Sequence, residues 1–369
     1  MRFVRATLLM TTVLAAFCGA QTRYFGGIDL GSKGTKAALF SSMRTPEGDD
    51  IELILGKTIN TKLVSSMKDG RFTDGGIQEA TDAAKTLVDA MQAKAKEENL
   101  SNVTYYIVGS SGVAAGQNKE ELAAKVNVAT HIEMTFIDAK SEGYLGMMSA
   151  VPVSRLTTSM YIDIGSGNTK LGCLVGGSDS KNFKSEEIKY GSVSGRNRAR
   201  ELNHEDIADG LQQVMKEVAD KYATDSEDIP CLRNRQRIYW TGGAAWATAT
   251  FMHPERALSA RVVITKHDID TFIARLKDGT WNQRKPVLTF PKEMSEARQA
   301  KIRAKAEAGR QDVLNVFVRE DLLSGVSLMK TVLESSNPSA VIVFGRESGF
   351  IYGYAEEHYH DSKSENASR

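Results

Sequence analysis

Cysteine and histidine are scarce in this chain of 369 residues, which contains three cysteines and six histidines. Neither type gathers with the spacing that a structural zinc site needs, so the sequence argues against one. The net charge of +1 is too small to attract nucleic acid or a membrane surface by bulk electrostatics. An apolar content of 41% and a charged content of 25% are typical of globular proteins, and the length allows two domains.

The apolar run near the N-terminus is too short to cross a bilayer as a helix. It reads ATLLMTTVLAAF, follows the basic segment MRFVR, and precedes the small residues Cys18 and Ala20. This layout is typical of a cleavable secretory signal, with a buried first helix as the alternative. Bulky Phe17 argues against lipidation of Cys18. Residues 1–20 are therefore predicted to be a signal peptide cleaved near Ala20, leaving an exported (periplasmic or secreted) protein with no stable membrane insertion.

Signal cleavage would leave Cys173 and Cys231 as the cysteines of the mature chain. They could form one disulfide in an oxidising compartment. Cys173 falls in a predicted strand, however, and the favoured interpretation is a small buried hydrophobe.

Two stretches of the chain share an unusual sequence motif. They are GIDLGSKGTK around Asp29 and YIDIGSGNTK around Asp163. In each, a buried strand ends in aspartate and leads into a turn rich in glycine and hydroxyl side chains. Gly31 and Gly34 predict a tight hairpin with positive φ, and the N–H groups of such a turn can point at one anion. Two such turns facing each other would grip a phosphate chain, and the aspartates would hold Mg²⁺ or another divalent cation. The predicted phosphate-binding residues of the turns are Gly31, Ser32, Lys33, Gly34 and Thr35, and Gly165, Ser166, Gly167, Asn168, Thr169 and Lys170.

The order of predicted elements also occurs twice. Three strands and then helices alternating with strands follow each copy of the motif, which predicts a duplicated α/β architecture. A cleft between two such halves is the usual place for a ligand.

The pair of turns resembles the two phosphate loops of the actin/hexokinase/heat-shock ATPase superfamily. Within it, the chain resembles the exopolyphosphatase and guanosine pentaphosphate phosphatase (Ppx/GppA) family. VGSSGVAAGQN resembles that family's ATSAxRxAxN, DIGSGNTKL resembles DIGGGSTEL, and IYWTGGAAWA resembles VGTGGTAxAL, in family order. The resemblance implies two ribonuclease-H-like (actin-like ATPase) domains from an internal duplication, over 24–150 and 151–347, with an interdomain cleft. A C-terminal segment, 348–369, could return to the first domain and end in a frayed tail. The resemblance also suggests a homodimer.

Carried over by position, the resemblance implies a catalytic role for Glu142, which would position and deprotonate the attacking water. Asp163 would be catalytic beside it, and Asp29 and Asp163 would hold the metal. Gly242 and Gly243 would let a ligand approach the second domain closely. Without the resemblance, Glu142 is interpreted as a helix-cap residue and the glycine pair as an ordinary strand-to-helix turn.

The chain departs from the family pattern in its phosphate loops. Ala114 stands where the family has arginine, and Lys170 stands where it has glutamate. Ser166 and Asn168 replace glycine and serine. A lysine in place of glutamate could bind phosphate directly or weaken metal binding.

The predicted function is an exported, Mg²⁺-dependent phosphoanhydride hydrolase of exopolyphosphatase type, with polyphosphate or a nucleotide as its partner and no nucleic acid. An ectonucleotidase-like NTPase or NDPase is the alternative enzyme. Because Lys170 and Ala114 depart from the family pattern, a catalytically silent polyphosphate- or nucleotide-binding protein is the third hypothesis.

Basic residues cluster in GRNRAR, which contains Arg196, Arg198 and Arg200. In an alternating strand they would share one face and could line a channel for a polyanion. A solvated face is the favoured interpretation.

Overall fold

The computed structural model describes residues 22–31, 34–45, 48–64, 66–283, 288–336, 338–344 and 349–367. The predicted signal segment, residues 1–20, lies outside these ranges. Within them, none of the helices combines the length and the apolar character needed to cross a membrane.

The first half of the chain forms a five-stranded sheet in the order β3-β2-β1-β4-β5. β1, β2 and β3 are antiparallel neighbours, whereas β4 runs parallel to β1 and β5 parallel to β4. The elements are β1 Arg23–Leu30, β2 Gly34–Thr45, β3 Gly48–Asn60, α1 Asp74–Glu97, β4 Val103–Gly109, α2 Ser111–Ala114, α3 Lys119–Thr130, β5 Met134–Phe136 and α4 Ala139–Ala150.

The second half forms a six-stranded sheet in the order β10-β11-β9-β6-β7-β8. β8-β7-β6-β9-β11 repeats the order of the first sheet, with the same antiparallel and parallel pairings. The strands are β6 Ser159–Ile164, β7 Thr169–Leu174, β8 Phe183–Ile188, β9 Arg237–Gly242, β10 Arg261–Ile264 and β11 Ala340–Phe344. The helices are η1 Val153–Thr158, η2 Ser180–Asn182, α5 Ser192–Leu202, α6 Ile207–Asp228, α7 Cys231–Asn234, α8 Gly243–Met252, η3 Pro254–Arg256, α9 Lys266–Lys277, α10 Glu296–Val316, α11 Arg319–Ser336 and α12 Ile351–Ala367.

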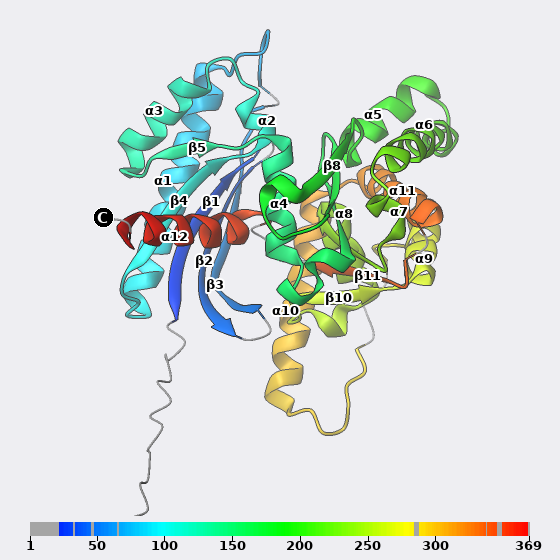
Figure 1. Cartoon of the computed structure of the whole chain (residues 1–369). Coiled ribbons are helices and arrows are strands. Elements are labelled where there is room, and N and C mark those ends of the chain that lie inside the picture. Colours follow the sequence, from blue (N-terminus) through cyan, green and yellow to red (C-terminus); the bar gives the residue numbers. More distant parts are fainter. Residues whose placement is uncertain are drawn as a thin grey trace, which may run out of the picture.

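The two sheets lie on either side of α4, and α12 crosses back to the first sheet (Figure 1). α12 packs against α4 and β1, while α4 packs against β6, β7 and β8. A shared apolar core fills this middle layer, with Phe25 and Phe40 from the first sheet, Tyr161 from the second and Tyr352 from α12. The close approach depends on Gly146 of α4, because a Cβ there would lie 2.2 Å from the Tyr161 hydroxyl. Both halves of the chain therefore pack against one central helix, α4.

The GRNRAR stretch belongs to helix α5, so the condition under which its arginines would share one face, an alternating strand, is not met. On a helix, residues two apart point to different sides, and Arg196, Arg198 and Arg200 do not form one basic face. Arg196 is ion-paired with Asp321 at 2.7 Å, and Arg198 with Glu201 at 3.2 Å. The serines and glycine of SVSG, which begin α5, gave no strong helical signal.

Cys173 in β7 is disulfide-bonded to Cys231 in α7, with their Cα atoms 6.3 Å apart. Cys173 is fully buried, as expected, but its interpretation as an unbonded hydrophobe is wrong. The bond joins a strand in the middle of the second sheet to a short helix that packs on it.

Candidate active site

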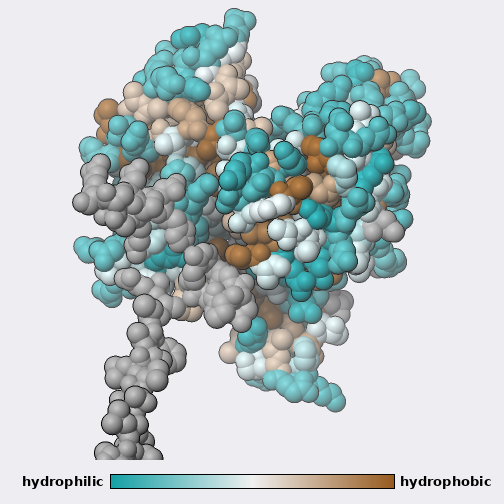
Figure 2. All heavy atoms as spheres, in the orientation of Figure 1, coloured by the Kyte–Doolittle hydropathy of each residue, from teal (hydrophilic) through white to brown (hydrophobic). Residues whose placement is uncertain are grey.

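The two repeated turns are closed by the same hydrogen bond. Gly31 N–H donates to the carbonyl of Gly34, and Gly165 N–H to that of Asn168, each at 3.0 Å. Neither Gly31 nor Gly34 has a positive φ, so the turn does not use the conformation that these glycines permit. Ser32 and Lys33 lie outside the described residues. The repeat seen in the sequence is therefore a repeat of backbone geometry. Figure 2 shows a notch between two lobes at the top of the view.

Each turn carries an aspartate and a lysine as direct cross-strand partners. Asp29 of β1 pairs in register with Lys36 of β2, and Asp163 of β6 pairs with Lys170 of β7. Lys36 Nζ lies 3.2 Å from Asp29 Oδ2, and Lys170 Nζ lies 3.8 Å from Asp163 Oδ2. The two halves thus present the same acid–base pair at the same place.

Glu142 stands in the first turn of α4, but it does not cap that helix. Asp138 is the N-cap and accepts a hydrogen bond from Ser141 N–H at 2.7 Å. Glu142 Oε2 instead accepts from the N–H of Ser111, at the start of α2, at 2.9 Å. Its Oε1 accepts from Lys170 Nζ at 3.0 Å, which connects the first half of the chain to the second.

Burial disfavours the charged form of Glu142, but Lys170 and the Ser111 N–H outweigh it and lower the pKa of this carboxyl below its ordinary value. Burial likewise opposes the charged form of Lys170, whose pKa is nevertheless raised by Glu142 and Asp163. Both groups are therefore charged at neutral pH.

Asp163 is held from the other side by β9. Its Oδ1 accepts a hydrogen bond from Thr241 Oγ1 at 3.2 Å, and the Thr241 hydroxyl also contacts that of Tyr161 at 2.8 Å. A continuous polar network thus runs from α2 through Glu142 and Lys170 to Asp163 and β9.

Asp29 is the most buried carboxylate of the cluster, with 5% of its surface exposed. Burial raises its pKa above the ordinary value, the charges of Glu142 and Asp163 add to the rise, and Lys36 opposes it. Its Oδ1 has no hydrogen-bond partner among the residues that the structure describes. A buried acceptor of this kind is usually satisfied by an ordered water, an ion or a ligand.

The second turn directs its carbonyl groups toward helix α5. Gly165 O accepts from Ser192 N–H, and Ser166 O accepts from the N–H groups of Val193 and Ser194. The N–H groups of 166–168 have no acceptor within the described part of the chain. The Asn168 nitrogen faces Gly191, where an added Cβ would lie 2.8 Å from it. Near them, Asn168 Nδ2 donates to Glu187 at 2.5 Å.

Two predicted phosphate-binding side chains lie apart from the cluster. Because side chains alternate along a strand, Thr35 and Thr169 face the opposite side of their strands from Lys36 and Lys170. Thr169 Oγ1 donates to the carbonyl of Tyr190 at 2.8 Å, and Thr35 is fully buried. The structure therefore brings the lysines, not these threonine hydroxyls, to the carboxylates.

Gly242 and Gly243 join β9 to α8 beside Asp163. Gly242 has φ 98°, and a Cβ there would lie 2.2 Å from Ile164 O and 3.1 Å from Asp163 Oδ1. A Cβ on Gly243 would lie 2.4 Å from the Phe317 ring. The close approaches made by this pair are to the protein itself.

We expect Gly242→Ala to lower the free energy of unfolding by about 1–3 kcal/mol, because alanine rarely adopts this backbone conformation. Urea denaturation measures the change. Gly75→Ala is the matched control, since nothing lies within 4 Å of its added Cβ and its φ is not in the left-handed region. Equal stability of the two variants would contradict the prediction.

The magnesium site expected at Asp29 and Asp163 was tested against the side chains present. Mg²⁺ prefers carboxylate oxygens and water in octahedral geometry. In the described ranges, no three His, Cys, Asp or Glu side chains are arranged to hold a metal ion. Lys36 contacts one oxygen of Asp29, while Lys170 contacts Glu142 and lies near Asp163. The side chains as they lie do not fit Mg²⁺, and its binding stays a prediction.

Sequence reasoning omitted Lys36, Ser111 and Thr241 from the site. The signal for Lys36 was available, because the pair Thr-Lys follows both turns. Ser111 acts through its backbone N–H, which any residue would offer. Thr241 reaches Asp163 because β9 lies next to β6, a pairing that no local pattern predicts.

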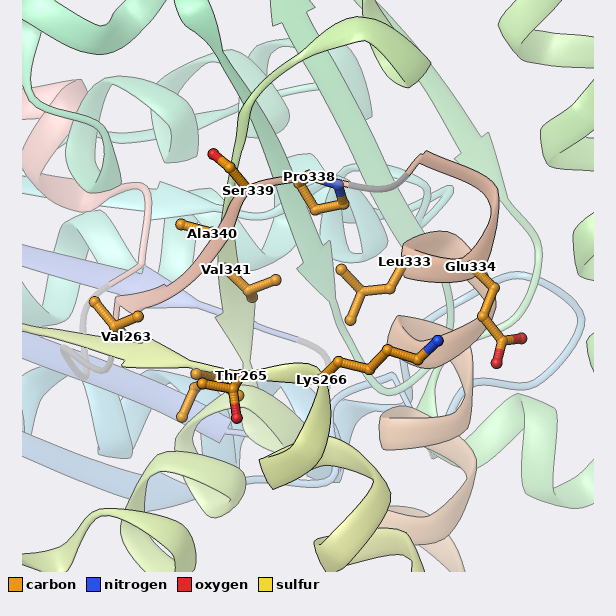
Figure 3. A pocket seen from close by; sticks show the side chains of 10 residues that line it. Val263, Thr265, Lys266, Leu333, Glu334, Pro338, Ser339, Ala340 and Val341 are labelled. Atoms are coloured by element: carbon orange, nitrogen blue, oxygen red, sulfur yellow. The ribbon is translucent and has the colours of Figure 1, made fainter.

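A pocket of about 240 Å³ includes Lys170 and lies between α4, β7 and β8. A larger one, of about 420 Å³, lies between the start of α9, the end of α11 and strands β10 and β11 (Figure 3). Aliphatic side chains, such as Val263, Leu333 and Val341, line much of the larger pocket, and none of the cluster residues borders it. The larger pocket therefore holds none of the candidate catalytic side chains.

No protein-family model matches the sequence, and no curated protein matches it. Solved structures do match. A Ppx/GppA family member from Aquifex aeolicus is 15% identical, with a TM-score of 0.62 over 93% of this chain and 99% of that chain. The chain has the Ppx/GppA fold. An exopolyphosphatase from Cytophaga hutchinsonii shares that fold at 15% identity, with a TM-score of 0.55 over 90% of this chain and 96% of that chain. The shared fold and the repeated strand order confirm the predicted α/β architecture of two similar halves.

Proposed function

We propose that this protein is an exported hydrolase of phosphoanhydride bonds that removes terminal phosphate from polyphosphate. The observation that carries the proposal is the network that joins Glu142 to Lys170 and Asp163 between the two turns. Structural neighbours described as Ppx/GppA phosphatase and exopolyphosphatase support the reaction class.

In the proposed reaction, the N–H groups of the second turn and the lysines bind the terminal phosphoryl group. Glu142 holds a water molecule, whose oxygen attacks the terminal phosphorus. The bond from that phosphorus to the bridging oxygen breaks, and the bridging oxygen keeps the electron pair. One proton of the water passes by way of Glu142 to the solvent, which leaves inorganic phosphate and a chain shorter by one phosphate. Because phosphoryl transfer has a loose transition state, positioning and charge neutralisation contribute most of the catalysis. A glutamate with a lowered pKa suits the positioning role better than that of a strong base.

The disulfide supports the export part of the proposal. Disulfides form and persist in oxidising compartments and are rare in the cytosol. Cys173–Cys231 is such a bond, and it agrees with the secretory signal expected over residues 1–20.

A substrate panel tests the proposal. Purified mature protein is given long-chain polyphosphate, ATP or GTP, and released phosphate is measured. We expect release from polyphosphate to be the fastest. Equal or faster release from a nucleotide would favour the ectonucleotidase-like alternative.

The catalytically silent binding protein is favoured by one observation, since both oxygens of Glu142 already have donors. Binding of polyphosphate with no release of phosphate from any substrate would establish that alternative.

A further inference from the structure

We propose that Lys36 and Lys170 supply the positive charge of this site, so that it binds phosphate chains without a divalent metal ion. The inference rests on the proposed function of the same site. It concerns what neutralises the phosphate, which the fold leaves open.

The two lysines are equivalent in the duplication. Each follows a turn closed by the same 3.0 Å hydrogen bond, and each is the direct cross-strand partner of the aspartate before that turn. One half therefore places Lys36 beside Asp29, and the other places Lys170 beside Asp163. A phosphate chain lying between the turns would meet one ammonium group from each side.

Most of the carboxylate oxygens that a metal would need already accept from a donor. Lys36 lies 3.2 Å from Asp29 Oδ2, and Lys170 lies 3.0 Å from Glu142 Oε1. The other oxygen of Glu142 accepts from Ser111 N–H, and Asp163 Oδ1 accepts from Thr241. A divalent ion would have to displace ammonium groups from carboxylates that they already neutralise.

Asp29 Oδ1 remains as a buried acceptor without a donor among the described residues. It points to a ligand that can donate a hydrogen bond, such as water or the hydroxyl of a protonated phosphate. Asp163 Oδ2 has only the Lys170 ammonium near it, at 3.8 Å. Two such oxygens, each on a carboxylate that is paired with a lysine, do not make a magnesium site.

The lysines can bind phosphate without leaving the carboxylates. An ammonium group has three N–H donors, and the contacts described use one donor of Lys36 and at most two of Lys170. Lys36 is the more accessible, with 43% of its side chain exposed, whereas Lys170 is 9% exposed. Lys36 is thus placed to receive a chain from solvent, and Lys170 to hold its end near Glu142.

The test measures binding and hydrolysis separately. Isothermal titration calorimetry of the full-length mature protein with tripolyphosphate is run in EDTA and then with millimolar Mg²⁺. We expect dissociation constants that agree within threefold. Lys36→Met and Lys170→Met should each weaken binding at least tenfold in EDTA. Lys184→Met, an exposed lysine on the neighbouring strand β8, should bind as wild type does.

Lys170→Glu is the converse variant, because it replaces the ammonium group with a carboxylate. We expect it to lose binding in EDTA and to regain it with Mg²⁺. Wild-type protein that binds tripolyphosphate only with Mg²⁺, or not at all, overturns the inference. Binding in EDTA without release of phosphate sustains the inference and overturns the proposed hydrolase instead.

Discussion

Glu142→Gln is expected to release phosphate from polyphosphate at least about 100-fold more slowly than wild type, because a positioned carboxylate contributes about 10²–10⁴-fold to such reactions. Glutamine keeps the size of the side chain and can still accept from Ser111 N–H. It removes the negative charge that faces Lys170 and the water. The initial rate of phosphate release at saturating polyphosphate measures the effect.

The substitution should lower kcat and leave substrate binding unchanged, since the proposed role of the carboxylate is to hold the water and not the phosphate chain. Tripolyphosphate should therefore bind the variant within about threefold of wild type. Glu120→Gln is the matched control, since Glu120 is also a first-turn glutamate but is exposed on α3. A Glu142→Gln variant as active as the control would remove Glu142 from the proposed mechanism.

The sequence predicted the duplication because both copies keep the same local motif. A buried strand, an aspartate and a small polar turn recur together, and each half then builds the same strand order. The helix at GRNRAR was not predicted, for the opposite reason. Arg196, Arg198 and Arg200 alternate as they would in a strand, whereas the helix packs against α6, which follows it in the sequence, and against the distant α11.

Of the candidate site, the sequence predicts the two aspartates, the two turns and Glu142, but not the contacts between them. That Glu142 meets Lys170 depends on α4 packing against β7, which is a property of the tertiary structure. The same limit applies to the disulfide. Cys173 and Cys231 are separated by 58 residues and meet because α7 packs on β7. Neither pairing leaves a periodic signal in the sequence.

Replacing both cysteines by alanine should lower the free energy of unfolding of the second half by about 4 kcal/mol, as chain-entropy estimates give for a loop of this length. The bond closes a loop with a sequence separation of 58 that includes most of the second half's β8, α5 and α6. Without it, the unfolded chain gains freedom that folding must remove. Urea denaturation followed by tryptophan fluorescence reports this change, because Trp240, Trp246 and Trp281 all lie in the second half.

The double variant also provides its own control. Dithiothreitol should lower the urea midpoint of the wild type toward that of the variant and leave the variant unchanged.

Because β7 carries Lys170 as well as Cys173, loss of the bond should also affect binding at high temperature. We expect it to lower the temperature at which polyphosphate binding fails, while the dissociation constant at 10 °C stays within about twofold of wild type. A loss of less than about 1 kcal/mol would contradict a stabilising role for the bond, since removal of native disulfides typically costs 2–5 kcal/mol.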